Sequence, residues 1–147
     1  MLKLTSRDQF QTLHDAGVLQ ADAPETPAII YVATDADPIT ITRGHFQQQA
    51  RRYASALAAQ GIGDRDLVVI AHTQNLESIY AFWGALLIGA IPSMFPTLTE
   101  KLDRSVYMRD MATLIKLSEV KLVLTTDEFA PELREVVACE VLGSSQI

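Results

Sequence analysis

The chain has 147 residues, which is enough for one domain of ordinary size. Hydrophobic residues make up 48% and charged residues 20%, so the composition is typical of a globular protein and not of a disordered one. Twelve basic against eighteen acidic residues give a net charge of −6, which argues against a nucleic-acid-binding surface.

The single cysteine and the N-terminal residues indicate the cellular compartment of the protein. One cysteine, Cys139, excludes an internal disulfide framework and a cysteine-based zinc cluster. The segment Met1 to Thr5 has no apolar run that could serve as a signal peptide. We therefore expect a cytoplasmic protein in a reducing environment.

The N-terminal region predicts one helix and a linker. Ser6-Arg7-Asp8-Gln9 has the spacing of a capping box, which favours a helix from about Arg7 to Ala16. Asp22 to Pro27 holds two prolines and two acidic residues, as linkers do. We expect residues 1–26 to form an N-terminal helix and linker, and residues 27–147 to form an α/β subdomain.

Strands and helices then alternate along the chain. Ala28–Ala33 and Ile39–Ile41 predict two paired strands, and Thr42 is a good cap for a helix through Leu57. The later predicted elements are, in order, a strand at Leu67–Ala71, a helix capped by Asn75 and ending at Ile88, a strand at Ile91–Phe95, a helix capped by Asp103, a strand at Lys121–Thr125, a short helix from Asp127 toward Val137, and a strand beginning at Val141. This order predicts an α/β fold with a mostly parallel sheet and helices on both faces.

The segment Ile79 to Pro96 is the most apolar part of the chain. Gly84, Gly89 and Pro92 interrupt it, so it is too broken for a membrane-spanning helix. We expect a short helix buried on all sides, followed by a buried strand, and no membrane span.

His72 is the first candidate site residue. It follows the predicted strand Leu67–Ala71, and ligands of open α/β sheets bind beyond the carboxyl ends of the strands. The alternative is that His72 is solvated and that Thr73 or Asn75 only caps the next helix.

Phe82 and Trp83 are the second pair of candidates. With Tyr80, Met94 and Phe95 they form an aromatic and methionine-rich group around one helix and the next strand. Such a group usually packs in a core, and the alternative is the wall of an apolar ligand pocket. We keep Phe82 and Trp83 as possible contacts of an acyl group.

The remaining motifs give no evidence for a phosphate, metal or catalytic site. Gly61-Ile62-Gly63 follows a helix and precedes a strand, so it indicates a helix stop and turn and not a phosphate loop. The three histidines lie on different predicted elements, which does not favour a metal site. Cys139 is expected to be a buried structural residue. The chain has no Gly-x-x-x-x-Gly-Lys-Ser/Thr loop, no Gly-x-Ser-x-Gly elbow and no His-Glu-x-x-His motif, so we expect no catalytic, cofactor-binding or metal residues within it.

Four segments follow one another along the chain: the strand and helix entry Ile39–Arg43, the turn and strand Gly61–Ile70, the helix and strand Phe82–Pro92, and the helix and strand Leu117–Thr125. In this order they resemble the opening of an AMP-forming acyl-CoA synthetase or acyl-adenylate ligase. The Phe82-Trp83-Gly84 form and Phe95-Pro96-Thr97 resemble the fatty-acid-type members. Arg43 and His45 depart from the tyrosine and glutamate often seen after the entry threonine.

The resemblance implies the first part of the large N-terminal domain of an adenylate-forming ligase. The parent enzyme would use ATP and Mg to activate a carboxylic acid, which we expect to be a fatty acid, as acyl-AMP and then pass the acyl group to a thiol. The family's phosphate loop and catalytic lysine would follow this segment, so we expect a fragment that is inactive alone. Its partner would be the remainder of the ligase chain, or a second copy across an exposed sheet edge.

Two other interpretations stay open. The chain could be a complete small α/β module that binds a ligand or a partner without catalysis. A flavodoxin-like or receiver-like domain also fits the alternation of strands and helices, but it would need a phosphate loop or acidic residues at the carboxyl ends of strands.

Overall fold

The structure is a computed structural model that describes residue 13 and residues 23–72, 75–96, 98 and 102–147. The chain forms two compact units, Met1–Gln49 and Ala50–Ile147, and each is described by itself. The predicted helix from Arg7 to Ala16 lies outside the described residues except for Leu13. Within the described part, no helix is both long and apolar enough to cross a membrane.

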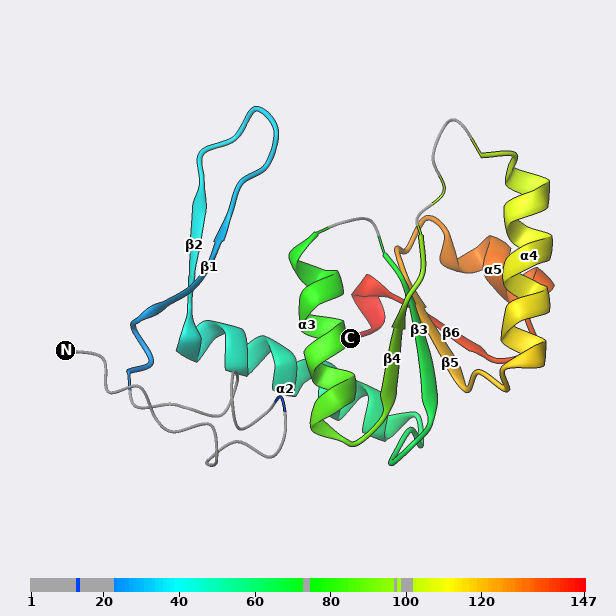
Figure 1. The fold of residues 1–147 in the computed structure, drawn as a ribbon, viewed down its shortest axis with the longest axis horizontal. Coiled ribbons are helices and arrows are strands. Elements are labelled where there is room, and N and C mark those ends of the chain that lie inside the picture. Colours follow the sequence, from blue (N-terminus) through cyan, green and yellow to red (C-terminus); the bar gives the residue numbers. More distant parts are fainter. Residues whose placement is uncertain (1–12, 14–22, 73–74, 97, 99–101) are drawn as a thin grey trace. The chain divides into compact units, whose positions relative to one another are not determined.

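The first unit contains a β-hairpin and the start of a long helix (Figure 1). Strand β1 (Pro27–Tyr31) pairs antiparallel with β2 (Ile39–Thr42), which confirms the predicted pairing. The hairpin loop includes Asp35 with a positive φ of 60°. Helix α2 (Arg43–Ala59) begins where the Thr42 hydroxyl accepts a hydrogen bond from the His45 N–H at 3.3 Å, as the sequence predicts.

The second unit is built on a four-stranded parallel sheet with the order β4-β3-β5-β6. The strands are β3 (Leu67–Ala71), β4 (Ile91–Met94), β5 (Leu122–Thr125) and β6 (Glu140–Gly143). Every residue of β5 is buried, and only Leu67 of β3 is partly exposed. Continuous apolar runs of this kind are typical of strands covered on both faces.

Helices cover both faces of this sheet, as predicted (Figure 1). They are α3 (Leu76–Leu87) on one face, and α4 (Arg104–Leu117) and α5 (Ala130–Val136) on the other, with a short 3-10 turn at Ser144–Gln146. Asn75 and Asp103 cap α3 and α4 with side-chain oxygens, as the sequence predicts. A buried cluster that includes Met111, Val123 and Leu133 forms the core beneath α4 and α5.

Gly61 and Gly84 have identifiable structural roles. Gly61 has a φ of +79° in the turn after α2, which confirms the predicted helix stop. Gly84 lets α3 approach α2 closely, since a Cβ at this position would lie 2.9 Å from both the Ala50 carbonyl oxygen and the Ala54 nitrogen. Tyr53 of α2 packs at the same place and is 1% exposed.

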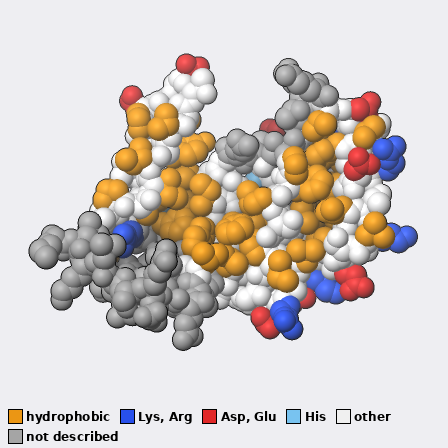
Figure 2. Space-filling view, viewed as in Figure 1, with side chains coloured by type: hydrophobic (Ala, Val, Ile, Leu, Met, Phe, Trp, Pro, Cys, Tyr) orange, Lys and Arg blue, Asp and Glu red, His pale blue; other side chains and the backbone are white. Residues whose placement is uncertain are grey.

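Two details of the prediction are wrong. The strand at Ile91 is not buried, because β4 is the edge of the sheet, and Ile91 and Met94 are each 51% exposed. The helix is not buried on all sides, because only one face of α3 packs inward; the residues on that face include Ala81, Gly84 and Ala85. Figure 2 shows hydrophobic side chains gathered over α3 and toward β4.

Candidate functional site

The carboxyl edge of the sheet gathers residues that are far apart in the sequence. His72 follows β3, Thr126 and Asp127 follow β5, and Ser144 and Ser145 follow β6. The three strands are adjacent and parallel, so these residues come to one edge. This edge is where open α/β sheets bind ligands.

His72 is enclosed by protein at this edge. Its exposed fraction is 2%, which contradicts the alternative that it is solvated. Within the described part of the chain, neither ring nitrogen has a hydrogen-bond partner. Burial lowers the pKa of His72 below its usual 6.5, against the carboxylates of Glu77 and Asp127, which act to raise it. The ring is therefore neutral at pH 7, with one donor and one acceptor nitrogen unused.

Asp127 is held by the turn that follows β6. Its Oδ1 accepts hydrogen bonds from the Ser145 N–H at 3.0 Å and from the Ser145 hydroxyl at 2.8 Å. These hydrogen bonds lower the pKa of Asp127 below its usual value. An ionised carboxylate therefore acts on His72 from the residues that follow β5.

Glu77 provides a second carboxylate from the first turn of α3. It accepts a hydrogen bond from the Tyr53 hydroxyl, which fixes the start of α3 against α2. Burial, together with this hydrogen bond to Glu77, raises the pKa of Tyr53 above its usual value. Tyr53 thus remains a neutral donor, and Glu77 is oriented by it.

The strand ends themselves are joined by a buried hydroxyl. Thr125 is fully buried, and its Oγ1 donates to the carbonyl oxygen of Ala71 at 2.9 Å. This hydrogen bond satisfies the last carbonyl of β3 and ties it to β5. The backbone immediately before His72 is consequently fixed.

A small cavity of about 190 Å³ opens beside Ala71 on the side of α4 and α5. Arg104 and Tyr107 contribute to its lining, but each already has a partner. The Arg104 guanidinium forms an ion pair with Glu132, and the Tyr107 hydroxyl donates to the Pro96 carbonyl at 2.8 Å. Burial raises the pKa of Tyr107 to about 12. The two other polar side chains that line the cavity are Thr126 and Glu128, so its one charge outside an ion pair among the described lining residues is negative.

Phe82 and Trp83 lie in the second half of α3, whereas His72 precedes that helix. The two rings make an edge-to-face contact with centroids 6.3 Å apart, and both side chains are half-buried. At 1.5 Å per residue, they lie about 10 Å along the helix axis from its first residue. The structure thus brings the two rings together, but it does not bring them to the edge that holds His72.

Asp127, which acts on His72, and Ser145, which holds Asp127, were not predicted as site residues. A usable signal was present, because both follow predicted strands of a parallel sheet and must meet at its carboxyl edge. Their hydrogen bonds could not be read from the sequence, since they depend on the turn after Gly143.

The described residues at this edge can bind and orient a polar ligand group. Among them, no group of three or more His, Cys, Asp or Glu residues could hold a metal ion. At this edge, the Arg104 guanidinium is paired with Glu132 and is not a free cation.

Comparison with known proteins gives a consistent result. The sequence pattern of the family described as AMP-binding enzyme matches residues 19–146. An acetyl-coenzyme A synthetase from Methylobacillus flagellatus is 37% identical over 67 residues, which are 46% of this chain and 10% of that protein. A 4-coumarate–CoA ligase 2 from Oryza sativa subsp. japonica is 29% identical over 115 residues, which are 78% of this chain and 18% of that protein.

The fold agrees with a solved structure of the same kind. The chain superposes on the O-succinylbenzoate coenzyme A synthetase (MenE) of Bacillus subtilis in complex with AMP with a TM-score of 0.66 and 23% identity. The match covers 86% of this chain and 30% of that structure. The chain spans less than a third of the length of these relatives. The sequence match over residues 19–146 places the chain in the AMP-binding enzyme family, the adenylate-forming ligases.

Proposed function

We propose that the chain forms the first part of the large N-terminal domain of an acid–thiol ligase. The longer enzyme would activate a carboxylic acid as acyl-AMP at the expense of ATP, release pyrophosphate, and transfer the acyl group to a thiol. The observation that carries this proposal is the family match over residues 19–146. The parallel sheet supports it, since its order of elements follows that of a solved ligase.

The catalytic step is assigned to the longer protein and not to this segment. ATP and Mg are the cofactors expected of the family, and the residues that bind them are assigned to the longer protein. The contribution proposed for this segment is structural, together with contacts at the carboxyl edge through His72.

The substrate proposed is an apolar carboxylic acid, with a fatty acid as the favoured example. Support comes from the half-buried edge-to-face pair of Phe82 and Trp83 on α3, which offers an apolar wall. The names of the relatives contain three different acyl parts, namely acetyl, 4-coumarate and O-succinylbenzoate. All three names also contain coenzyme A, which favours it as the thiol over a carrier protein.

The partner proposed for the sheet edge is the remainder of the ligase chain, with a second copy as the alternative. Strand β4 is an edge strand whose Ile91 and Met94 are half exposed. Unpaired apolar edges of this kind promote association. Sedimentation of the isolated 147 residues should show dimers or larger species, whereas the longer protein should sediment as a discrete species.

Residues 27–147 remain our proposal for the α/β subdomain, with residues 1–26 as its N-terminal helix and linker. A cytoplasmic location also remains a proposal. Limited proteolysis of the chain should cleave first between Asp22 and Pro27 if the proposed boundary is correct. First cleavage within residues 43–59 would instead favour a boundary inside α2.

Carboxylate-dependent exchange of pyrophosphate into ATP tests the function. The protein purified from its source at native length should catalyse exchange with apolar acids, and faster with longer alkyl chains. The 147 residues alone should show no exchange above background. No exchange with any acid at native length would refute the proposed activity, and exchange by the isolated segment would refute its assignment to the longer protein.

A second candidate function is a binding module without catalysis. The unit Ala50–Ile147 favours it in one respect, since it has its own closed core around Met111 and Val123. The exchange assay separates the two functions, because a binding module gives no exchange at any length.

A further inference from the structure

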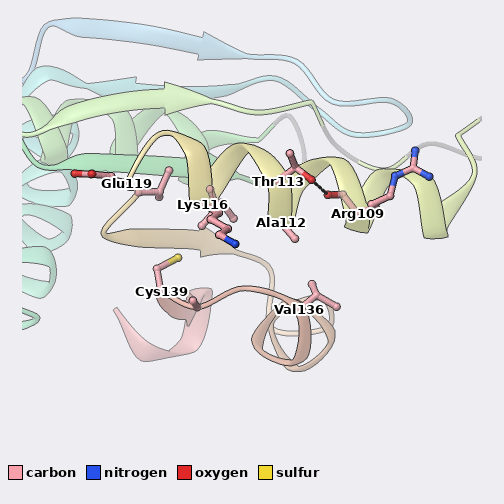
Figure 3. A pocket seen from close by; sticks show the side chains of 10 residues that line it. Arg109, Ala112, Thr113, Lys116, Glu119, Val136 and Cys139 are labelled. Carbon is pink, nitrogen blue, oxygen red and sulfur yellow. Dashed lines mark hydrogen bonds between the residues drawn. The ribbon is translucent and has the colours of Figure 1, made fainter.

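A larger hollow lies at the opposite edge of the sheet from His72. It is a groove of about 620 Å³ between α4 and the segment that leads from α5 into β6 (Figure 3). Val120 lies just before β5 and Cys139 just before β6, so the groove is on the amino side of these strands. Ligands of open α/β sheets usually bind beyond the carboxyl ends of the strands, so that tendency does not explain a groove at the amino ends.

The groove has an apolar lining with a fixed floor. Six apolar residues line it: Ala112, Ile115, Val120, Val136, Ala138 and Cys139. Ile115 and Val120 belong to the buried core, which holds the floor in place. Three of the others are small, which leaves the space open. A volume of about 620 Å³ lies within the range of small-molecule sites, about 300–1,000 Å³.

The charge of the groove comes mainly from Lys116. In Figure 3 its amino group points between α4 and Cys139, while the Glu119 carboxylate points away from it. Among the described residues, no acidic side chain lies within ion-pair distance of Lys116. Arg109, at the other end of the groove, is paired with Asp110 at 3.2 Å. Lys116 is therefore the cation best placed to meet an anion in the groove.

We propose that this groove binds a free, straight-chain alkyl carboxylate, with the carboxylate at Lys116 and the alkyl chain along α4 against Ala112 and Val136. The apolar lining accounts for the chain, and Lys116 accounts for the single negative charge. From Lys116 to Arg109 the groove follows about 10 Å of helix, at 1.5 Å per residue. This binding site is separate from the proposed acyl-activating function and does not depend on it.

A structural role for Lys116 is the competing explanation. Lys116 lies in the last turn of α4, where a positive charge also favours the helix dipole. That role would affect stability, but it would not create affinity for an acid. Measuring stability and binding on the same variants therefore separates the two.

Cys139 makes the test direct, because it is the only cysteine in the chain and lines the groove. Its alkylation by N-ethylmaleimide, followed by intact mass on the 147-residue chain at pH 8, reports occupancy of the groove. Burial raises the pKa of the Cys139 thiol, so the reaction should be slow enough to follow. Dodecanoate below its micellar concentration should protect Cys139, and dodecyltrimethylammonium should protect it at least fivefold more weakly.

The length of the alkyl chain tests the apolar part. From octanoate to decanoate to dodecanoate, the concentration for half protection should fall about fourfold for each added methylene that is fully buried. The fall should stop when the chain outgrows the groove. Equal protection by all three acids would overturn the proposal.

Matched variants test the contribution of the Lys116 charge and the need for open space beside Ala112. Lys116→Gln should weaken protection by dodecanoate about fivefold, the upper range for a partly exposed ion pair. Lys121→Gln, an exposed lysine outside the groove, should leave it unchanged. Ala112→Phe should abolish protection by filling the groove, and its urea midpoint checks that it still folds.

Three results would overturn the proposal. In the first, dodecyltrimethylammonium protects Cys139 as well as dodecanoate does. In the second, Lys116→Gln leaves protection by dodecanoate unchanged. In the third, Lys116→Gln and Lys121→Gln weaken protection by dodecanoate by the same factor. Protection by phosphatidylcholine vesicles but not by free dodecanoate would indicate a lipid surface instead of a free acid. Pyrophosphate exchange plays no part in these readouts, so failure here leaves the proposed ligase function intact.

Discussion

The two edges of the four-stranded sheet differ in chemistry and in access. At the carboxyl edge, His72 is 2% exposed and is flanked by the carboxylates of Glu77 and Asp127, each held by a hydroxyl donor. At the amino edge, a groove of about 620 Å³ is open and apolar, with Lys116 as its main charge. The histidine at the carboxyl edge is therefore enclosed, whereas the groove at the amino edge is open.

This difference shows what a parallel sheet determines and what it leaves free. The carboxyl ends of β3, β5 and β6 bring polar residues together through topology alone. The groove has a different origin, because it depends on small residues such as Ala112 and Ala138 where α4 and the segment before β6 would otherwise touch. The residues that meet at the carboxyl edge can be predicted from the order of the elements. The groove can be identified only from the three-dimensional packing of the side chains.

The largest expected effect comes from Gly84→Ala, which disturbs the packing behind the carboxyl edge. The added Cβ would lie 2.9 Å from the backbone of Ala50 and Ala54, so α2 must shift. We expect the free energy of unfolding to fall by about 2–3 kcal/mol, measured by urea titration. Gly63→Ala is the control, with no atom within 4 Å of the added Cβ, and should change stability by less than about 0.5 kcal/mol. Equal effects would contradict the close α2–α3 contact.

His72→Leu tests the enclosed state of His72 through the pH dependence of the free energy of unfolding. The folded pKa of His72 lies below its unfolded value of 6.5, so the unfolded state binds the proton first as pH falls. The parent should therefore lose up to about 1.4 kcal/mol per pH unit below pH 6.5, down to the folded pKa. His72→Leu should lack this loss and should be as stable as the parent or more so at pH 7.5, because an unpaired buried ring is removed.

The measurement is the free energy of unfolding between pH 5 and pH 7.5. His45→Gln, at an exposed position on α2, serves as the control and should keep the dependence that His72 causes. Parallel curves for His72→Leu and the parent would show that His72 is not held neutral.

Asn75→Ala tests the cap that starts α3 at the polar edge. The Asn75 Oδ1 accepts from the Ser78 N–H at 3.0 Å, and losing this cap should cost about 1 kcal/mol of unfolding free energy. Asn75→Gly should cost only about a few tenths of a kcal/mol, since glycine is tolerated at this position. A larger loss in the glycine variant, by the same urea titration, would argue against the cap.

The smallest expected effect is that of Asp127→Asn. Hydrogen bonds from Ser145 lower the folded pKa of Asp127 below its usual 3.8, so its contribution is present above pH 3.8 and is lost as pH falls below that value. The variant should be slightly less stable than the parent at pH 7, and the difference should disappear in acid. A difference that persists at pH 2.5 would point to a steric cause instead.

Much of the fold could be predicted because its signals are local. The continuous apolar run Leu67–Ala71 matches β3 as observed, and the caps at Asn75 and Asp103 start α3 and α4. The exposure of Ile91 and Met94 could not be predicted, because the strand order decides which strand is an edge. The sequence of an apolar strand does not indicate whether a neighbouring strand or another part of the protein covers it.

The candidate site was only partly predictable for a related reason. Following β3, His72 could be placed at the carboxyl edge from sequence order, but its burial depends on what packs over it. Cys139 was expected to be buried and instead is half-buried at the edge of a groove. The groove itself arises from residues of α4 and of the segment after α5, and no local pattern joins them.

We propose that this chain is the opening part of a longer adenylate-forming ligase. The most direct test of this proposal is the intact mass of the polypeptide isolated from its natural source, with peptide mapping. We expect a chain several times longer than 147 residues, with peptides that contain this sequence and continue beyond Ile147. A native polypeptide that begins at Met1 and ends at Ile147 would contradict it.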